Sequence, residues 1–136
     1  MFKVHHVAIS VKDLSVSEEF YKKLGFRKVS YWKAEDNSLE ISHMKLNGFI
    51  LEIFCFKNPE ENPVLKEDLW TNLKVLGVKH FALQTEDIYT TLENLKKTGI
   101  ATEETTVSKG RTGILYFFVK DPDGIFVEIV EDKRNL

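Results

Sequence analysis

Apolar and polar positions in the first half of the chain predict five elements of secondary structure. Apolar residues at every second position, many of them β-branched, are typical of a half-buried strand, and apolar residues at every third or fourth position are typical of a helix. The predicted elements are a strand at residues 3–11, a helix at 15–24 and strands at 26–33, 39–46 and 49–56. Asn47-Gly48 separates the last two strands and is a strong hairpin signal. The first half therefore has the predicted order β-α-β-β-β.

The predicted helix carries signals along one face and at both ends. Val16, Phe20 and Leu24 recur at intervals of four residues and therefore share one helical face. Ser15-Val16-Ser17-Glu18 fits a capping box, in which the serine and glutamate side chains bond free N–H groups of the first turn. Gly25 stands where a glycine commonly ends a helix. We therefore expect this helix to begin at Ser15.

The second half repeats this order after an interruption at residues 57–77. Two prolines and several polar residues at 58–63 predict a turn, and Leu65, Leu69 and Trp70 are compatible with one loose helical turn. We interpret residues 57–77 as a linker between two modules. The elements predicted after it are a strand at 78–85, a helix beginning near Ile88 and ending before Gly99, and strands near 100–107, 114–119 and 125–131.

The two halves also share an internal repeat of sequence, which is a strong indicator of repeated architecture. Residues 6–14 and 80–88 both read histidine, apolar, alanine, apolar, polar, β-branched, charged, aspartate, apolar. Residues 48–54 and 124–130 both begin with glycine and carry a glutamate four positions later. His80 follows His6 by 74 residues, and Glu128 follows Glu52 by 76. Each half therefore supplies one histidine and one glutamate at matching places.

The two glutamates stand in runs that are otherwise apolar, Phe-Ile-Leu-Glu-Ile-Phe and Ile-Phe-Val-Glu-Ile-Val. A carboxylate there has to be paired, hydrogen-bonded or metal-bound, because its desolvation would otherwise cost several kcal/mol. Neither run contains an arginine or a lysine. Imidazole and carboxylate ligands together suit a divalent transition metal ion. We therefore predict one metal site with four ligands, His6, Glu52, His80 and Glu128.

Each of these residues alone has an ordinary explanation. A single histidine on a strand is more often a hydrogen-bonded core residue than a ligand, and a single strand glutamate more often faces solvent at a sheet edge. The joint pattern favours the metal site, because both residue types recur at equivalent places. We assign no role in it to His5, which would point to the face opposite that of His6, or to His43, which has no counterpart in the second half.

Composition and charge narrow the classes of function. A chain of 136 residues with 43% hydrophobic and 29% charged residues fits a single domain, 1–136, made of module one at about 1–56, the linker and module two at about 78–131. A net charge of −2 without a basic stripe argues against nucleic acid as a partner. No apolar run approaches the roughly 20 residues that span a bilayer, and the N-terminus has no signal-peptide core. Cys55 is the only cysteine, which suits a reducing cytoplasm. We expect a cytoplasmic protein that acts on a small-molecule substrate.

These motifs resemble those of the vicinal oxygen chelate superfamily, which contains glyoxalase I, bleomycin resistance proteins and dioxygenases, and they look most like the glyoxalase I type. The resemblance covers essentially the whole chain. Its motifs are His-x-x-x-x-Val-Lys-Asp-Leu at 6–14, Phe-Tyr-x-x-Leu-Gly-Phe at 20–26, Glu52, His80 and Asp-Pro-Asp-Gly-x-x-x-Glu at 121–128.

The resemblance implies an α+β fold of two tandem βαβββ modules related by a pseudo-two-fold axis, with mixed sheets that form a metal-containing cleft. It implies that the residues of the predicted site, His6, Glu52, His80 and Glu128, hold one nickel, cobalt or zinc ion. It also implies a homodimer, because short bacterial glyoxalases pair in this way.

For the activity, the resemblance implies a lyase acting on an α-hydroxycarbonyl adduct of a thiol, by proton transfer through a metal-stabilised enediolate. Glu128 is the stronger candidate for the catalytic base, and Glu52 is its counterpart across the site. Members that use glutathione carry an arginine four residues after the first ligand and an asparagine four after the second. Ser10 and Phe56 stand at those positions here, which argues against glutathione as the thiol.

Other branches of the superfamily are open alternatives. The epimerases usually carry glutamine where Glu52 stands, and thiol transferases of the fosfomycin-resistance type use two histidines and one glutamate. Extradiol dioxygenases use a three-ligand iron site in a longer chain. Non-catalytic members that sequester bleomycin lack the metal ligands and trap a small molecule in the dimer cleft. Metal content separates this last alternative from the enzymes.

Overall fold

The computed structural model describes all 136 residues, which divide into two compact units, Met1–Glu61 and Asn62–Leu136. Each unit contains one four-stranded mixed sheet. The strand-helix-strand-strand-strand order predicted for each half is confirmed, and the fold is therefore α+β with two βαβββ modules. Every helix is too short or too polar to cross a lipid bilayer.

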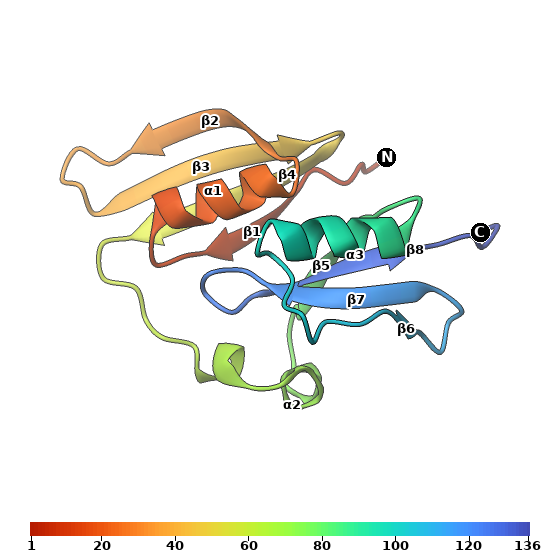
Figure 1. Cartoon of the computed structure of the whole chain (residues 1–136). Helices are drawn as coiled ribbons and strands as arrows, with labels where there is room; N and C mark the ends of the chain where they lie inside the picture. The colour runs from red at the N-terminus through yellow and green to blue at the C-terminus, as the bar shows by residue number, and fades with distance from the viewer. The chain divides into compact units, whose positions relative to one another are not determined.

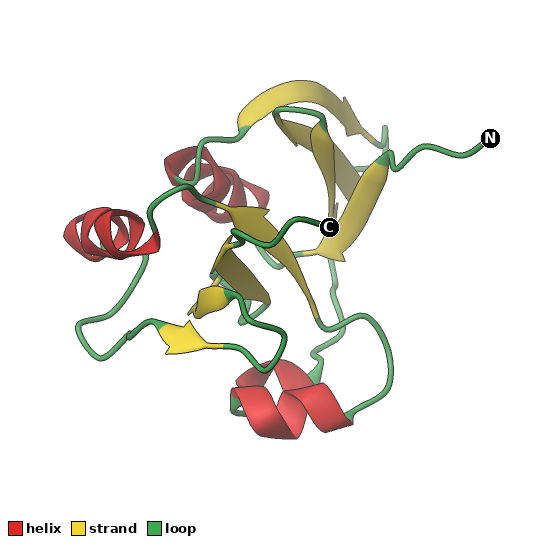
Figure 2. Cartoon of the chain, turned by 90° about the vertical axis from the view of Figure 1, so that its right-hand side faces the viewer, coloured by secondary structure: helices red, strands yellow, loops and turns green.

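In the first unit, α1 lies on one face of a sheet with the strand order β1-β4-β3-β2 (Figure 1, Figure 2). Strand β1 pairs with β4 in parallel, and the other neighbours are antiparallel. The Asn47-Gly48 turn joins β3 to β4, as predicted, and Asn47 has a φ of +51°. The elements are β1 (His6–Ser10), α1 (Leu14–Lys23), β2 (Arg27–Lys33), β3 (Leu39–Leu46) and β4 (Phe49–Phe56).

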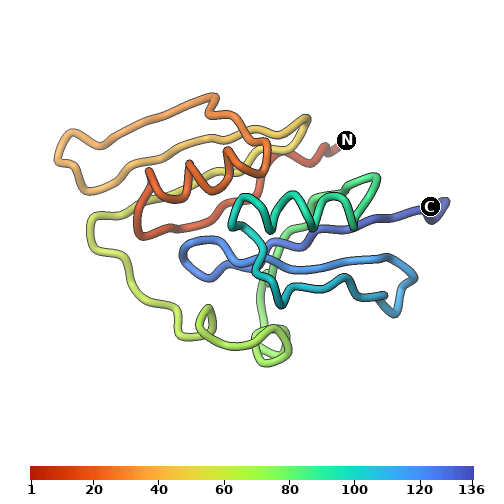
Figure 3. The backbone as a smooth tube through the Cα atoms, in the orientation of Figure 1, coloured from red at the N-terminus to blue at the C-terminus, as the bar shows by residue number.

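The second unit repeats this arrangement, with α3 in contact with β8 and the strand order β5-β8-β7-β6. Strand β5 pairs with β8 in parallel, and β8, β7 and β6 are antiparallel neighbours. The elements are a 3-10 turn η1 (Pro63–Lys66), α2 (Leu69–Lys74), β5 (His80–Gln84), α3 (Ile88–Lys97), β6 (Ser108–Lys109), β7 (Leu115–Lys120) and β8 (Phe126–Glu131). Figure 3 traces this path along the backbone.

One face of each sheet is buried, and this decides where the two glutamates point. The buried residues nearest to them along the chain are Leu51 and Ile53 on β4 and Val127 and Ile129 on β8, which are at most 3% exposed. Each such burial stabilises the fold by about 1.5–3 kcal/mol. Because successive side chains of a strand point to opposite faces, Glu52 and Glu128 project from the other face of their sheets.

The helix caps differ from the prediction. Helix α1 begins at Leu14, and the side chain of Asp13 caps it by accepting a 3.1 Å hydrogen bond from the N–H of Val16. The predicted capping box at Ser15 is wrong, because Ser15 lies inside the first turn. Asp87 caps α3 in the same way, with a 3.0 Å bond from the N–H of Thr90. The repeated aspartate of the two sequence motifs is therefore a repeated cap, and its extended φ and ψ suit the exit from a strand.

The strand predicted at residues 100–107 is also wrong. The strand before β7 is only Ser108–Lys109, and the threonines ahead of it form a local turn. The N–H of Thr105 donates to the carbonyl of Thr102, and the N–H of Thr102 donates to the hydroxyl of Thr105. Threonine hydroxyls that bond nearby backbone compete in this way with a sheet ladder.

The linker is hydrogen-bonded to the second unit. The ammonium group of Lys120 on β7 donates to the carbonyls of Leu65 and Glu67, at 3.2 and 3.1 Å. The side-chain amide of Asn72 on α2 donates to the carbonyl of Val64 at 3.2 Å. The loose helical turn predicted here is in fact a 3-10 turn followed by a short helix, which Asp68 caps.

Candidate functional site

His6 and Glu52 form the first of two similar pairs. They lie on the parallel strands β1 and β4, where Ala8 is opposite Glu52 and His6 is opposite Ile50. The histidine and the glutamate therefore lie on the same face of the sheet, two residues apart in register along the neighbouring strands. The Nε2 atom of His6 is 3.4 Å from Oε2 of Glu52, and the two side chains are 43% and 20% exposed.

His80 and Glu128 form the second pair, with the same register on β5 and β8. Ala82 is opposite Glu128, and His80 is opposite Phe126. The Nε2 atom of His80 is 3.1 Å from Oε2 of Glu128, and this pair is less exposed, at 25% and 14%. The repeated sequence therefore corresponds to a repeated geometry, an imidazole facing a carboxylate on the open face of each sheet.

His43, to which we assigned no role from the sequence, also contacts Glu52. It lies on β3 directly opposite Glu52, and its Nε2 atom is 2.9 Å from Oε1 of that carboxylate. A signal for it did exist in the sequence. A two-residue turn at Asn47-Gly48 pairs Leu46 with Phe49, and the same register places His43 opposite Glu52. His5 also has a contact near the site, since its Nδ1 is 2.9 Å from Nδ1 of His6.

An aromatic residue occupies the place of His43 in the second unit. Phe118 on β7 lies opposite Glu128. Its ring meets the ring of His80 edge to face, with centroids 4.9 Å apart. Tyr116 and Phe126 pack against Phe118 in turn, both with centroids 5.7 Å apart. The second pair is therefore set in an aromatic surface, whereas the first has a further imidazole.

The donor atoms of the two pairs fit a transition metal ion in kind. Imidazole nitrogen and carboxylate oxygen are common ligands of zinc, cobalt and nickel. Each pair supplies two such donors on its own unit, and the structure gathers no set of three or more histidine, cysteine, aspartate or glutamate side chains that could hold a metal ion. The single site made of all four residues therefore stays a prediction. The Nδ1 atom of His80 is buried and has no hydrogen-bond partner.

A hollow of about 370 Å³ in the second unit is lined in part by Phe118, the aromatic neighbour of His80, although neither His80 nor Glu128 lines it. Aromatic side chains and hydroxyl groups line it together. The lining residues are Leu69, Trp70, Thr102, Glu104, Thr105, Thr106, Ser108, Tyr116, Phe117 and Phe118. Trp70 is 60% exposed, and the guanidinium of Arg111 lies over its ring, 5.9 Å from the centroid. The hollow has the mixed apolar and polar lining of a small-molecule pocket.

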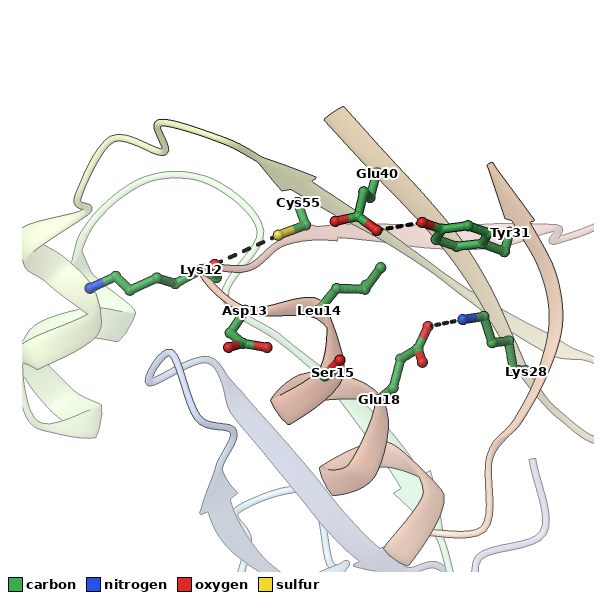
Figure 4. A pocket seen from close by; sticks show the side chains of 9 residues that line it. All are labelled: Lys12, Asp13, Leu14, Ser15, Glu18, Lys28, Tyr31, Glu40 and Cys55. Atoms are coloured by element: carbon green, nitrogen blue, oxygen red, sulfur yellow. Dashed lines mark hydrogen bonds and ion pairs between the residues drawn. The ribbon is translucent and has the colours of Figure 1, made fainter. Parts of the chain in front are cut away.

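A second hollow, in the first unit, lies on the buried face of its sheet rather than the open one (Figure 4). Its charged groups largely pair with one another, as Lys28 does with Glu18 at 2.8 Å. Cys55 lines it and donates its thiol to the carbonyl of Lys12, with 3.6 Å between sulfur and oxygen. Cys55 and Glu52 are three positions apart on β4 and point to opposite faces. The hollow is therefore separate from the face of His6 and Glu52.

Comparison with known proteins agrees with this arrangement. The YaeR protein of Escherichia coli (strain K12), which is uncharacterized, is 31% identical over 131 residues, 95% of each chain. The crystal structure of a glyoxalase family protein from Enterococcus faecalis shares 31% identity over 95% of this chain and 97% of its own, with a TM-score of 0.77. A probable lactoylglutathione lyase of Vibrio cholerae is 41% identical over 56 residues, 40% of each chain.

The family assignment follows from a match over nearly the whole sequence. Residues 3–129 match the sequence pattern of the Glyoxalase/Bleomycin resistance protein/Dioxygenase superfamily. The two βαβββ modules and their mixed sheets are the fold that the motifs led us to expect. The chain therefore belongs to the glyoxalase/bleomycin resistance protein/dioxygenase superfamily, the vicinal oxygen chelate proteins.

Proposed function

We propose that the chain is a divalent-metal-dependent, glyoxalase I-like lyase that acts on the α-hydroxycarbonyl adduct of a thiol. The observation that carries the proposal is the repeated pair of imidazole and carboxylate on the open face of both sheets. Each half-buried carboxylate faces a histidine at an equivalent place. A pair of apolar residues would stabilise the fold at least as well as such a pair, so the fold alone does not explain the carboxylates. The partial match to a probable lactoylglutathione lyase supports the same reaction.

In this proposal His6, Glu52, His80 and Glu128 together hold one nickel, cobalt or zinc ion. The ion supplies a Lewis acid that stabilises negative charge as it develops on the oxygens of the substrate. The protein contributes a two-fold set of donors, two neutral nitrogens and two charged oxygens. Two carboxylates offset the charge of a divalent ion, which lowers the cost of burying it.

Glu128 is the proposed base. Its carboxylate takes a proton from the carbon that bears the hydroxyl group and returns it to the neighbouring carbon, so that the step is an isomerisation with no other reactant. Its side chain is only 14% exposed, and Phe118 and Phe126 lie on the same face of the sheet. Apolar neighbours keep water from the carboxylate, and the abstracted proton is then returned to the substrate rather than lost to solvent.

The surface beside Glu52 supports a thiol other than glutathione. Phe54 and Phe56 follow Glu52 on the same face of β4, and their rings stack with centroids 6.4 Å apart and 12° between planes. Ser10 on β1 lies opposite Phe54. This surface offers neither the guanidinium nor the amide that would bind a tripeptide, and it suits a less polar thiol.

We also propose that the chain works in the cytoplasm as a homodimer. Both proposals come from the sequence, the first from the lone cysteine and the second from the resemblance to short glyoxalases. Sedimentation velocity, which measures the mass of the particle in solution, tests the second directly.

Elemental analysis of the purified protein beside its His80→Ala variant is the first test. We expect about one nickel, cobalt or zinc ion per chain in the wild-type protein and a large loss in the variant, because His80 supplies a ligand. Removal and return of the metal should abolish and restore turnover of a hemithioacetal. A wild-type protein that neither holds nor takes up metal would contradict the proposal.

Two further variants test the carboxylates. Glu128→Gln and Glu52→Gln keep the shape of the side chain and remove the charge. We expect turnover to fall by about 10²–10⁴-fold in Glu128→Gln, the usual contribution of a positioned base, and to fall in Glu52→Gln as well, because a metal ligand loses its charge. Glu93→Gln on the exposed side of α3 is a matched control for the same chemical change. Full activity in both site variants would refute the proposed mechanism.

A binding protein without catalysis is the second candidate. The hollow beside Phe118, with its exposed Trp70 and its hydroxyl groups, favours it, because such a lining binds a flat organic molecule without help from a metal. A metal-free protein whose tryptophan fluorescence changes on titration with small aromatic molecules would support this candidate over the lyase.

A further inference from the structure

Glu52 has two imidazole neighbours, one for each of its oxygens. His43 Nε2 is 2.9 Å from Oε1, and His6 Nε2 is 3.4 Å from Oε2. The contact with His43 is a hydrogen bond between side chains that are 32% and 20% exposed, and therefore partly shielded from water. The carboxylate is thus held from one side and left with its second oxygen toward His6.

The backbone makes this arrangement rigid. His43 and Glu52 are direct partners in the antiparallel ladder of β3 and β4, and the tight turn at Asn47-Gly48 sets their register. Side chains directly opposite each other across such a ladder have Cβ atoms about 4.5–5.5 Å apart. Met44 and Leu51, the next pair along, have no exposed surface and anchor both strands to the core. A slip that separated His43 from Glu52 would expose this pair.

Glu128 has no equivalent partner. The residue opposite it is Phe118, which cannot donate a hydrogen bond and packs instead on the ring of His80. The pseudo-symmetry that relates the two pairs is therefore broken at this position, and the two carboxylates have different neighbours on the adjacent strand. Glu52 faces two imidazoles, those of His6 and His43, whereas Glu128 faces the imidazole of His80 alone.

We propose that His43 is a positioning residue whose Nε2–H donates to Oε1 of Glu52 and directs Oε2 of Glu52 toward the metal. The proposal rests on the proposed function, since it concerns how a metal ligand is oriented. His43 is not proposed as a ligand itself, because its Nε2 atom is already 2.9 Å from Oε1 of Glu52 and bonds that oxygen. A donor that orients a ligating carboxylate from behind typically changes metal affinity by 10–100-fold when it is removed.

The different surroundings of Glu52 and Glu128 have a chemical consequence. A carboxylate with one oxygen held by a neighbouring strand is suited to remain a ligand throughout the reaction. A carboxylate without such a donor is free to turn between the metal and the substrate carbon. The structure therefore divides the roles of Glu52 and Glu128 within the chain, by way of the residue on the adjacent strand.

Two variants of His43 test the proposal by zinc binding. His43→Phe reproduces the arrangement of Phe118, and His43→Gln keeps a side-chain N–H that can donate to the carboxylate. We expect the dissociation constant for Zn²⁺, measured by competition with a chromophoric chelator, to rise 10–100-fold in His43→Phe and by less than about threefold in His43→Gln. Circular dichroism confirms that each variant is folded.

A second measurement on the wild-type protein keeps the test independent of the variants. Long-range ¹H–¹⁵N spectra of protein labelled at its histidine rings report which ring nitrogen carries a proton. We expect His43 to carry its proton on Nε2 both without metal and after addition of Zn²⁺, whereas His6 and His80 change to the shift of a metal-bound Nε2.

The outcomes separate this inference from the proposed function. Equal zinc affinity in the wild-type protein and His43→Phe overturns the inference and leaves the four-ligand site standing. Loss of the Nε2 proton of His43 on addition of zinc makes His43 a ligand and also overturns it. Failure of the wild-type protein to bind zinc, cobalt or nickel removes the proposed function and the inference together.

Discussion

The turn at Gly124, just before β8, lies close to the linker at Leu65. Gly124 ends this turn with a φ of +92°, and a Cβ atom built on it would lie 2.6 Å from the carbonyl oxygen of Leu65. Real Cβ atoms essentially never come so close to another heavy atom. The carbonyl cannot easily retreat, because it accepts a 3.2 Å hydrogen bond from the ammonium group of Lys120. Gly124→Ala therefore combines backbone strain with a steric clash against the carbonyl oxygen of Leu65.

The magnitude follows from these two terms. A positive φ costs an alanine about 1–2 kcal/mol, and breaking or stretching the bond between Lys120 and Leu65 costs about 1–2 kcal/mol more. Gly113→Ala is a matched control in the same unit, since its φ is +94° and its Cβ would meet only a side-chain carbon of Arg134 at 3.8 Å. We expect a loss of about 2–4 kcal/mol for Gly124→Ala and about 1–2 kcal/mol for the control.

Unfolding by urea, followed by circular dichroism, measures both variants against the wild-type protein. A domain of this size loses about 3–5 °C in melting temperature for each kcal/mol, so a thermal scan gives an independent reading. Gly124→Ala should be less stable than Gly113→Ala by about 1–2 kcal/mol. Equal losses in the two variants would refute the close approach of the linker to the turn, and would leave only the backbone strain that both share.

Two further predictions concern the second unit. Glu131 accepts the N–H of Ile88 at 3.0 Å and pairs with Lys133 at 2.6 Å, and the bond from Lys133, followed by the bond from Ile88, lowers the pKa of its carboxyl group below the ordinary value. Because the pKa is lowered, the stability that Glu131 contributes is complete above about pH 4.3, the value of a free glutamate, and is lost as the pH falls further toward the folded-state pKa. In urea unfolding between pH 3 and 6, the wild-type protein should therefore lose stability more steeply than Glu131→Gln as the pH falls. Parallel curves for the two proteins would contradict this prediction. Trp70→Ala should raise the dissociation constant of a small aromatic molecule about tenfold or more, because an aromatic side chain that a ligand buries contributes about 1.5–3 kcal/mol, whereas zinc affinity should stay near that of the wild-type protein. An unchanged dissociation constant would show that Trp70 does not contact the ligand.

Much of the fold could be predicted from the sequence because the signals are local. Period-two alternation and the Asn47-Gly48 turn determine the hairpin of β3 and β4 to the residue, since a two-residue turn leaves only one register that keeps the apolar face buried. The strand predicted at 100–107 failed because threonine hydroxyls bonded the backbone locally, a choice that strand propensity does not reveal. The cap of α1 was misplaced by two residues because Asp13 and Ser15, both of residue types that commonly cap helices, are separated only by Leu14.

The candidate site shows the same division. The internal repeat by itself identified His6, Glu52, His80 and Glu128 as related residues, because a histidine and a glutamate recur at matching places in the two halves. The hairpin register also contained the pairing of His43 with Glu52, although a search for repeated residues passes over a residue that does not repeat.

Only the tertiary structure decided what surrounds the repeated pairs. Sequence spacing cannot show that Phe118 takes the place of His43 and packs on the ring of His80, because that contact joins strands distant along the chain. Nor can it show that the linker folds onto the turn before β8 and brings Trp70 to a hollow shared with Phe118. Local patterns set the strands and their faces, whereas the neighbours of each catalytic candidate depend on packing between segments that only the folded chain brings together.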